Sequence, residues 1–154
     1  MHNLILHHQI KTMDFLKLEN QLCFPLYALS RKVTAHYKPL LDELDLTYPQ
    51  YLVMLLLWEH QTLSVKELGD HLMLDSGTLT PLLKRLEQKK IVSRKRSAED
   101  ERIVLISLTP DGKKLQEKAV EVPNKLQCSL SLSDEDIVVT RSQIIKLLNK
   151  LKDV

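Results

Sequence analysis

The chain has 154 residues, of which 44% are hydrophobic and 27% charged, and its formal net charge is +2. This length fits one domain with a core of its own, and three glycines and six prolines are too few for a β-sandwich, a barrel or a disordered chain. The longest apolar run, residues 51–58, is too short to cross a bilayer, and two cysteines are too few for a secreted disulfide scaffold, so we expect a cytoplasmic protein without membrane contact.

Positive charge is concentrated in one short segment. Residues 84–102, "KRLEQKKIVSRKRSAEDER", carry eight lysines and arginines against four acidic residues, a local excess of +4 in a chain of net charge +2. Such a segment is typical of an edge that binds a polyanion. A solvated helix face followed by a charged turn would have the same composition, and the charges alone do not separate the two.

Helical spacing dominates residues 14–60. Residues 14–44 mix apolar and polar side chains at helical spacing, with interruptions expected at Pro25 and Pro39. The segment that follows, "LTYPQYLVMLLLWEH", is apolar on most sides, which predicts a buried helix with Trp58 in the core.

Two short helices with clear start signals come next. Ser64 and Glu67 form an S-x-x-E capping box, which satisfies the free amides of a helix start, and Gly69 would allow close packing. In "LDSG", Asp75 and Ser76 are both candidates for the N-cap of the following helix. The apolar side chains of that helix lie on one stripe: Leu79, Leu82, Leu83 and Leu86.

A β-hairpin and further helices complete the pattern. Residues 91–96 and 103–108 are rich in β-forming side chains and flank a charged tip, as in a hairpin. Thr109 caps a helix that Pro123 should bend or end. Ser133 caps a last amphipathic helix, whose apolar residues repeat at threes and fours.

Two short helices, a tight turn and a basic hairpin together predict a winged helix-turn-helix. The helix that starts at "DSGTLT" presents hydroxyl side chains and backbone amides at the end that enters a major groove. The hairpin would reach the neighbouring backbone or minor groove with its basic residues, Arg94, Lys95, Arg96 and Arg102. An acidic residue at the tip fits an internal clamp that orients an arginine by a bidentate pair. A winged helix used only for protein contacts is the alternative.

The helices outside this module have no partner within so small a domain. We therefore expect two copies to pair through them, which would place two recognition helices about 34 Å apart and match a palindromic operator. The expected fold is mainly α with a small β-hairpin wing, a winged helix-turn-helix of α+β type between N- and C-terminal dimerisation helices. A disordered extension (1–12) is expected before one domain (13–154), with the winged helix at about 47–110 and the dimerisation helices at about 14–44 and 111–153.

The sequence of this module resembles a known family. "DSGTLTPLLKRLE" followed by "RKRSAEDERIVLISLTPDG" is similar to the MarR family of bacterial transcription regulators. "LENQLCFPLY" with "YKPLLDELDLTYPQYLVMLLLWEH" is similar to its OhrR branch, the organic-hydroperoxide sensors, and the similarity spans roughly residues 18–123. It implies a homodimeric repressor that binds double-stranded DNA, is oxidised by an organic hydroperoxide and then releases its operator.

The resemblance also implies roles for single residues. Cys23 would be the peroxidatic thiol. Tyr37 and Tyr48 would form hydrogen bonds with this thiol across the dimer, and Tyr27 would be the supporting tyrosine one turn after it. Arg102 would enter the minor groove with Asp100 as its orienting carboxylate, and the recognition helix would meet bases. The expected DNA-binding set is Ser76, Thr78, Thr80, Lys84, Arg85, Arg94, Lys95, Arg96, Asp100 and Arg102.

The residues around Cys23 allow a reactive thiol by themselves. If Asn20 caps the first well-formed turn, Cys23 lies at its third position, where free backbone amides favour the reactive thiolate. Tyrosine hydroxyls are donors that would stabilise the same form. A buried, inert thiol is the alternative, and it is the commoner fate of a lone cytosolic cysteine.

Cys128 decides between two mechanisms of this branch. Some members carry only the reactive thiol, which a small external thiol then caps. Others carry a resolving cysteine between the last two helices, which forms a disulfide with the partner subunit. Cys128 lies in that region, but most of this sequence reads closer to the one-cysteine members. Both roles, resolving and incidental, stay open.

We expect no metal, no cofactor and no enzymatic turnover. His2, His7 and His8 have no acidic or cysteine partner at metal-ligand spacing. Two competing functions remain: a regulator of the same fold that binds small phenolic ligands at the dimer cleft, and a thiol peroxidase. If salicylate-like compounds abolish DNA binding and cumene hydroperoxide does not, the phenolic-ligand regulator is indicated. Sustained peroxide consumption with a thiol reductant would indicate the second.

Overall fold

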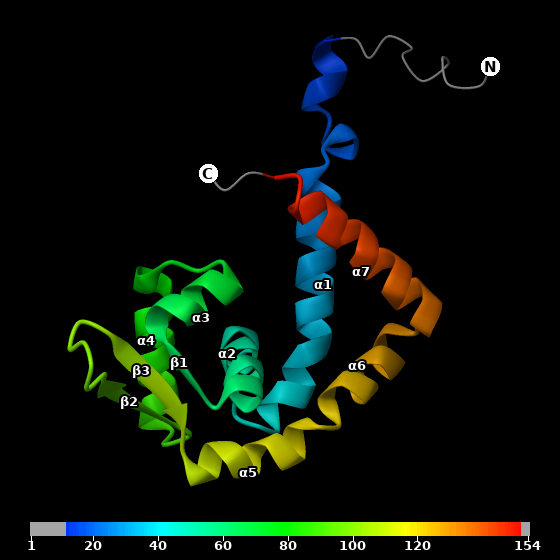
Figure 1. The fold of residues 1–154 in the computed structure, drawn as a ribbon. Helices are drawn as coiled ribbons and strands as arrows, with labels where there is room; N and C mark the ends of the chain where they lie inside the picture. The colour runs from blue at the N-terminus through cyan, green and yellow to red at the C-terminus, as the bar shows by residue number, and fades with distance from the viewer. Residues whose placement is uncertain (1–11, 152–154) are drawn as a thin grey trace. The chain divides into compact units, whose positions relative to one another are not determined.

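The computed structural model describes residues 12–151, which form two units that divide between Ala35 and His36 (Figure 1). The first unit holds two short 3-10 helices and the beginning of a long helix: η1 (Thr12–Leu16), η2 (Leu18–Asn20) and α1 (Cys23–Asp42). The second unit continues α1 and adds α2 (Tyr48–His60), β1 (Thr62–Ser64), α3 (Val65–Leu72), α4 (Ser76–Gln88), β2 (Val92–Arg96), β3 (Val104–Leu108), α5 (Pro110–Ala119), α6 (Val122–Leu130) and α7 (Asp134–Leu148). The extension expected at residues 1–12 lies outside the described residues except for Thr12, and it stays a prediction.

α1 runs through both of its prolines, so the interruptions expected at Pro25 and Pro39 are wrong. Pro25 is the third residue of the helix, where a backbone amide would have had no partner within the helix. Pro39 lies in the last turn and removes only one backbone hydrogen bond. The helix also begins at Cys23, because the Asn20 side-chain amide donates to the Asp14 carbonyl over 2.9 Å instead of capping α1.

Four helices of the second unit begin at predicted caps: α3, α4, α5 and α7. Ser64 and Glu67 form the full capping box of α3, with the Glu67 amide 3.1 Å from Ser64 Oγ and the Ser64 amide 2.7 Å from Glu67 Oε2. Asp75, not Ser76, is the N-cap of α4, because its Oδ1 accepts from the Thr78 amide over 2.9 Å. The caps expected for α5 and α7 are also present: Thr109 and Ser133.

A three-stranded antiparallel sheet in the order β1-β3-β2 forms the wing and its base. β2 and β3 pair as the predicted hairpin, from Val92 opposite Leu108 to Arg96 opposite Val104. β1 is absent from the sequence-based prediction, and it pairs with β3 through Thr62–Ser64. Three residues are too few to show the alternation of a strand, so this pairing has no local signal.

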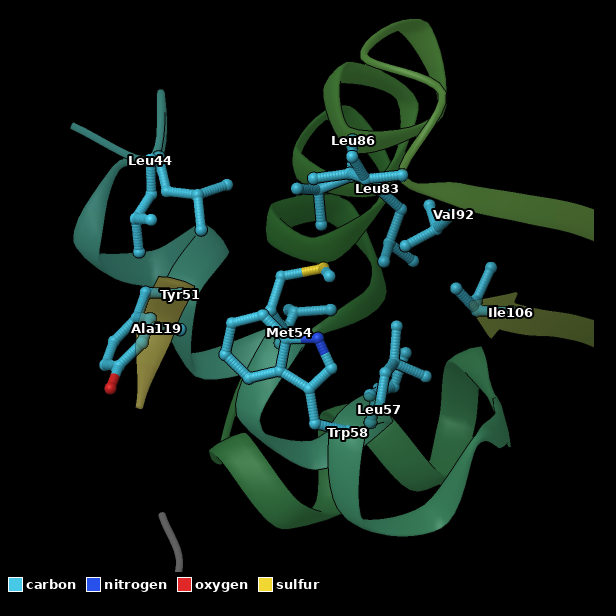
Figure 2. Close-up of a cluster of buried hydrophobic side chains, with 14 of the residues drawn as sticks. Leu44, Tyr51, Met54, Leu57, Trp58, Leu83, Leu86, Val92, Ile106 and Ala119 are labelled. Carbon is cyan, nitrogen blue, oxygen red and sulfur yellow. The ribbon is translucent and has the colours of Figure 1, made fainter. Parts of the chain in front are cut away.

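The core of the second unit lies where α2, α3 and α4 meet the sheet (Figure 2). Met54 and Leu57 of α2 are fully buried in it, as are three leucines of the predicted α4 stripe: Leu79, Leu83 and Leu86. Trp58 is 8% exposed, and its Nε1 donates to the Gly112 carbonyl over 2.9 Å. This hydrogen bond ties α2 to the start of α5 and satisfies the polar atom of a buried aromatic ring.

Two helical faces are apolar and are not covered within their own units. α5 ends at Ala119, before Pro123 as the sequence predicts, and α7 farther on buries no residue. The exposed apolar side chains of α7 form the first face: Val138, Val139, Ile145 and Leu148. The first unit exposes a second set: Phe15, Leu16, Leu18, Leu22, Phe24, Leu26, Tyr27 and Leu29. Apolar faces of this extent are typical of surfaces that another chain covers.

The described elements form a mainly helical chain with a small antiparallel sheet, so the predicted winged helix-turn-helix fold is confirmed. α3 and α4 are its helix-turn-helix, and β2 with β3 is its wing. Between residues 12 and 151, no helix combines the length and apolarity needed to span a membrane.

Candidate nucleic-acid interface and thiol site

The recognition helix, α4, presents polar side chains to solvent along its outer face. Ser76, Thr80 and Lys84 follow one another at four-residue spacing and therefore share a face. All three are exposed, as are Thr78 and Arg85, whereas three leucines of the stripe on the same helix are buried and the fourth, Leu82, is half-buried. The structure thus leaves all the α4 residues of the expected DNA-binding set accessible from outside.

Two hydroxyl groups of α4 are oriented by the helix itself. Thr78 Oγ1 donates to Asp75 Oδ2 over 2.8 Å, and Thr80 Oγ1 donates to the Ser76 carbonyl over 2.6 Å. The Thr78 backbone and then side-chain hydrogen bonds lower the pKa of Asp75. Because each threonine has already donated its proton, its oxygen remains as an acceptor, which suits an amino group on a base edge.

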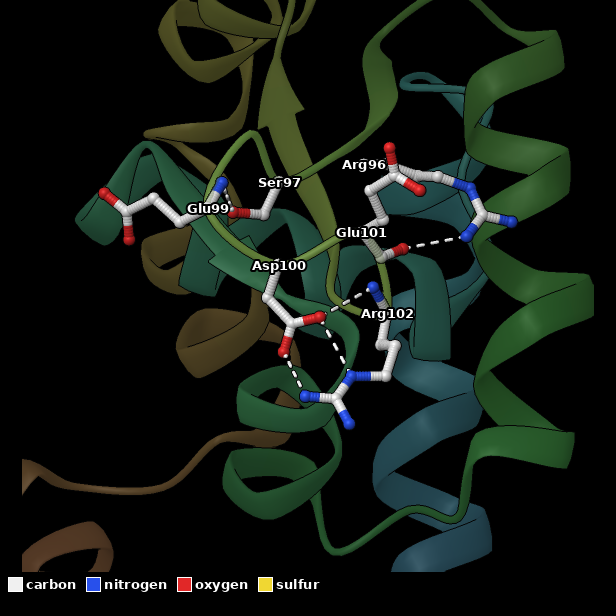
Figure 3. Close-up of polar contacts among 6 residues, drawn as sticks. All are labelled: Arg96, Ser97, Glu99, Asp100, Glu101 and Arg102. Atoms are coloured by element: carbon white, nitrogen blue, oxygen red, sulfur yellow. Dashed lines mark hydrogen bonds and ion pairs between the residues drawn. The ribbon is translucent and has the colours of Figure 1, made fainter.

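The wing tip contains the bidentate pair that the sequence predicts (Figure 3). Asp100 Oδ1 lies 3.0 Å from Arg102 Nε, and Asp100 Oδ2 lies 2.9 Å from Arg102 Nη2. The side-chain hydrogen bond from Arg102, followed by its backbone hydrogen bond, lowers the pKa of Asp100, and the pairing raises the pKa of Arg102. The Arg102 side chain is 90% exposed, so it is both oriented and accessible.

The other basic residues of the wing differ in their exposure and in the hydrogen bonds and ion pairs that their side chains form. The Arg94 side chain is 26% exposed, and its Nη1 lies 4.0 Å from Glu87 Oε2 of α4. Arg96 Nη1 donates to the Glu101 carbonyl over 2.8 Å (Figure 3). Lys95 is exposed and has no hydrogen bond or ion pair from its side chain within the described residues. We therefore expect Lys95 to be the most available phosphate contact of the wing.

A hollow of about 590 Å³ joins the helix-turn-helix to the wing. Its polar lining includes residues of α3, of α4 and of the hairpin: Lys66, Ser76, Thr80, Arg94 and Arg102. The lining also includes one acidic residue, Asp70, so three cations outweigh a single carboxylate beside the starts of two helices. Such a concave surface suits an anionic backbone. Lys66 is absent from the sequence-based prediction, because it lies far along the chain from the basic segment.

Cys23 is exposed and is the first residue of α1. The sequence places it at the third position of a turn capped by Asn20, and the structure moves it to the first, still within the turn whose amides have no helical acceptor. Amides without a helical acceptor are hydrogen-bond donors that remain for another group. Within its own unit Cys23 is not a core residue, and the exposed Tyr27 follows one turn later.

Tyr37 and Tyr48 lie together in the second unit, with ring centroids 4.8 Å apart. Tyr51, which the sequence analysis missed, joins them with its ring centroid 5.8 Å from that of Tyr37. Burial raises the pKa of Tyr37 to about 12, with smaller contributions from Tyr48 and Tyr51, and burial also raises the pKa of each of those two. All three hydroxyls therefore keep their protons at neutral pH and can act as donors.

Cys128 lies inside α6 and is exposed, so its expected position between the last two helices is wrong. No helix breaker follows Pro123 until the left-handed Ser131, and α6 consequently continues past Cys128 to Leu130. Neither cysteine belongs to a metal-binding cluster, since residues 12–151 bring no three His, Cys, Asp or Glu side chains together in such an arrangement.

Comparisons with known proteins identify the family. The model for the transcriptional regulator SarA/Rot family matches residues 35–119. The organic hydroperoxide resistance transcriptional regulator of Bacillus subtilis (strain 168) is 59% identical over 138 residues, which are 90% of this chain and 94% of that protein. The chain belongs to the MarR family of transcription regulators, in its OhrR branch.

The solved structures that resemble this OhrR-branch chain include a regulator bound to DNA. Reduced AbfR bound to DNA is similar with a TM-score of 0.75 and 39% identity, over 88% of this chain and 95% of that one. A disulfide form of AbfR, a protein of Staphylococcus epidermidis, is similar with a TM-score of 0.63 and 38% identity over the same shares of the two chains. The family resemblance read from the sequence is therefore confirmed.

Proposed function

We propose that this OhrR-branch chain is a homodimeric repressor that binds a palindromic operator and releases it when an organic hydroperoxide oxidises Cys23. The observation that carries the proposal is the 59% identity, over 90% of the chain, to an organic hydroperoxide resistance regulator. The exposure of Cys23 at a helix start supports it, because the thiol is accessible and has free amides beside it.

The two uncovered apolar faces support the homodimer. One belongs to the first unit and the other to α7, and neither is covered by residues of its own unit. A second copy carries the same two faces, so a two-fold dimer buries both on both chains. In this proposal residues 13–154 act as one dimerising domain, with the winged helix at about 47–110 and the dimerisation helices at about 14–44 and 111–153.

In the DNA-bound dimer, α4 lies in the major groove and the wing follows the neighbouring groove. Ser76, Thr78 and Thr80 face base edges, where the two threonine oxygens act as acceptors. Arg102 enters the minor groove in the orientation that Asp100 sets, and the remaining basic residues contact phosphates: Lys84, Arg85, Arg94, Lys95 and Arg96. The hollow of about 590 Å³ between these elements supports this arrangement.

The sensing step is the oxidation of the Cys23 thiolate. Its sulfur attacks the terminal oxygen of the hydroperoxide, the O–O bond breaks, and the sulfur becomes a sulfenic acid while the leaving alkoxide takes a proton to become an alcohol. Tyr27 of the same chain, with Tyr37 and Tyr48 across the dimer, would donate hydrogen bonds to the thiolate. Oxidation removes their charged acceptor, which changes the contacts that hold the DNA-binding arrangement.

Cys128 is proposed as the resolving thiol. Its sulfur would displace water from the sulfenic acid of Cys23 on the other subunit and form a disulfide between the chains. The exposure of both thiols is compatible with this step, and the relative AbfR has a disulfide form. A covalent link across the dimer would shift the two wings away from the spacing that fits one operator.

We infer a sensor in the cytoplasm rather than an enzyme. A sensor reacts once per cycle, whereas a thiol peroxidase turns over and would have no use for the exposed recognition helix and wing. Gel shifts with a fluorescent operator test the proposal. Wild type should release DNA on addition of cumene hydroperoxide, and Cys23→Ser should bind and stay bound. Release by salicylate alone would instead support the phenolic-ligand regulator.

A further inference from the structure

Arg31 makes two non-covalent contacts with Tyr27 in the first unit. Its Nη1 donates to the Tyr27 hydroxyl oxygen over 3.3 Å, and its guanidinium carbon lies 5.5 Å from the centroid of the Tyr27 ring. Tyr27 is 59% exposed, so packing within the described residues restrains its ring only weakly. A planar guanidinium that both stacks on a ring and bonds its hydroxyl restricts such a side chain to one orientation.

The direction of side chains in a helix extends this contact toward Cys23. Cys23, Tyr27 and Arg31 follow one another at four-residue spacing in α1 and share one face. Helical side chains lean toward the N-terminus, so that each residue covers the one about a turn before it. Arg31 therefore reaches back over Tyr27, and Tyr27 in turn reaches back toward Cys23.

The polarity of the contact decides what Tyr27 can do. The guanidinium only donates, so the Tyr27 oxygen is the acceptor and its own proton remains available for another group. A hydroxyl that accepts from a cation is a stronger donor to the next acceptor in the chain. The two acceptors that appear during the reaction are the thiolate sulfur of Cys23 and the alkoxide that leaves from the hydroperoxide.

We propose that Arg31 is a positioning residue for Tyr27 in the oxidation of Cys23, an inference that rests on the proposed sensing function. Arg31 fixes the Tyr27 ring and directs the free hydroxyl proton toward the reacting sulfur. In the reaction the S–O bond forms as the O–O bond breaks, and the departing alkoxide receives a proton that a hydrogen-bonded Tyr27 hydroxyl helps to supply. Arg31 itself touches neither the sulfur nor the peroxide.

The rate of sulfenic acid formation at Cys23 tests this role. It is measured with cumene hydroperoxide by trapping the product with dimedone, in full-length protein that carries Cys128→Ser. Arg31→Met should slow the reaction about fivefold, which is the effect of losing one hydrogen bond near the reacting groups. Arg31→Lys, which keeps a donor but not the planar fork, should recover part of the rate. Lys32→Met is the matched control: it removes the same charge one residue along, and within residues 12–151 Lys32 has no ion pair.

A double-mutant cycle separates positioning from simple charge. In a Tyr27→Phe background, Arg31→Met should have no further effect, because the hydroxyl through which Arg31 acts is gone. An equal slowing in that background, an equal effect of Lys32→Met, or an unchanged rate in Arg31→Met would each overturn the proposal. If wild-type Cys23 were not oxidised at all, the proposed sensing function itself would fail, so the two failures are distinguishable.

Discussion

Asp100 holds Arg102 through two parallel contacts at the wing tip, 3.0 Å from Oδ1 to Nε and 2.9 Å from Oδ2 to Nη2. The arginine is thereby oriented before DNA arrives. Arg102→Ala should weaken operator binding by about 1–3 kcal/mol, because it removes an oriented minor-groove contact. Asp100→Asn should lose less, since the guanidinium remains but its clamp is weaker. Fluorescence anisotropy with operator DNA measures both, and wild-type affinity in Arg102→Ala would show that the wing is assigned wrongly.

Unlike Arg102, Lys95 should contribute DNA affinity that does not depend on the DNA sequence. It is exposed at the wing and is expected to contact a phosphate, so Lys95→Ala should weaken binding to all duplexes alike. The slope of log affinity against log salt should become shallower by about one unit. Binding isotherms at several salt concentrations, on operator and on unrelated DNA, measure this. A loss confined to operator DNA would indicate that Lys95 reads bases.

Tyr37 should make stability depend on pH at the alkaline end. Its pKa is raised to about 12, whereas an unfolded tyrosine titrates near 10, so the folded chain holds this proton more tightly. The contribution is complete below pH 10 and is lost as the pH rises from about 10 to about 12. Urea unfolding across this range should show a smaller fall in the free energy of unfolding for Tyr37→Phe than for wild type. Parallel curves for the two proteins would contradict the burial of this hydroxyl.

Gly112 should not tolerate a side chain. A Cβ at this position would lie 2.0 Å from the Ile91 carbonyl oxygen, which is backbone at the base of the wing. Gly112→Ala should therefore lower the free energy of unfolding by more than about 2 kcal/mol. Gly77→Ala is the comparison variant. Its Cβ would lie 2.9 Å from Asp75 Oδ1, the N-cap acceptor of α4, so it should cost less than Gly112→Ala because a side-chain atom can shift where backbone cannot. Equal stability of the two variants would contradict the packing of α5 on the wing.

The Cys128 hypothesis has its own test. Oxidised wild type should run as a covalent dimer on non-reducing gels, and dithiothreitol should convert it to monomer. Cys128→Ser should still form the sulfenic acid at Cys23 but should give no covalent dimer. If oxidised wild type stays monomeric, a small external thiol must cap Cys23, and the exposed Cys128 on α6 is incidental.

The sequence reveals most where a feature is local. The Ser64–Glu67 box, the Thr109 cap and the Asp100–Arg102 pair each join residues at most three apart, and the structure contains all of them. The winged helix follows from the order of such local signals. The helix start at Cys23 is an exception, since Asn20 is a good capping residue whose side chain is used by the Asp14 carbonyl.

The features that sequence reasoning missed depend on tertiary contacts or on geometry. β1 exists only because β3 is there to pair with it, and Tyr51 joins Tyr37 from a different helix. Lys66 reaches the hollow beside the wing from α3, far from the basic segment. Arg31 is local to Tyr27, but an arginine four residues after a tyrosine is too common a pattern to stand out without the observed contact.

Titration of the operator complex with cumene hydroperoxide tests the central claim most directly. The anisotropy of a fluorescent operator is followed in wild type and in Cys23→Ser, while mass spectrometry records the oxidation state of Cys23. We predict that wild type releases its operator after about one equivalent of peroxide per chain, in step with the loss of the Cys23 thiol. Cys23→Ser should stay bound in excess peroxide. Release from Cys23→Ser at the same peroxide concentration, or wild type that stays bound after Cys23 is fully oxidised, would contradict the role of Cys23 as the sensor.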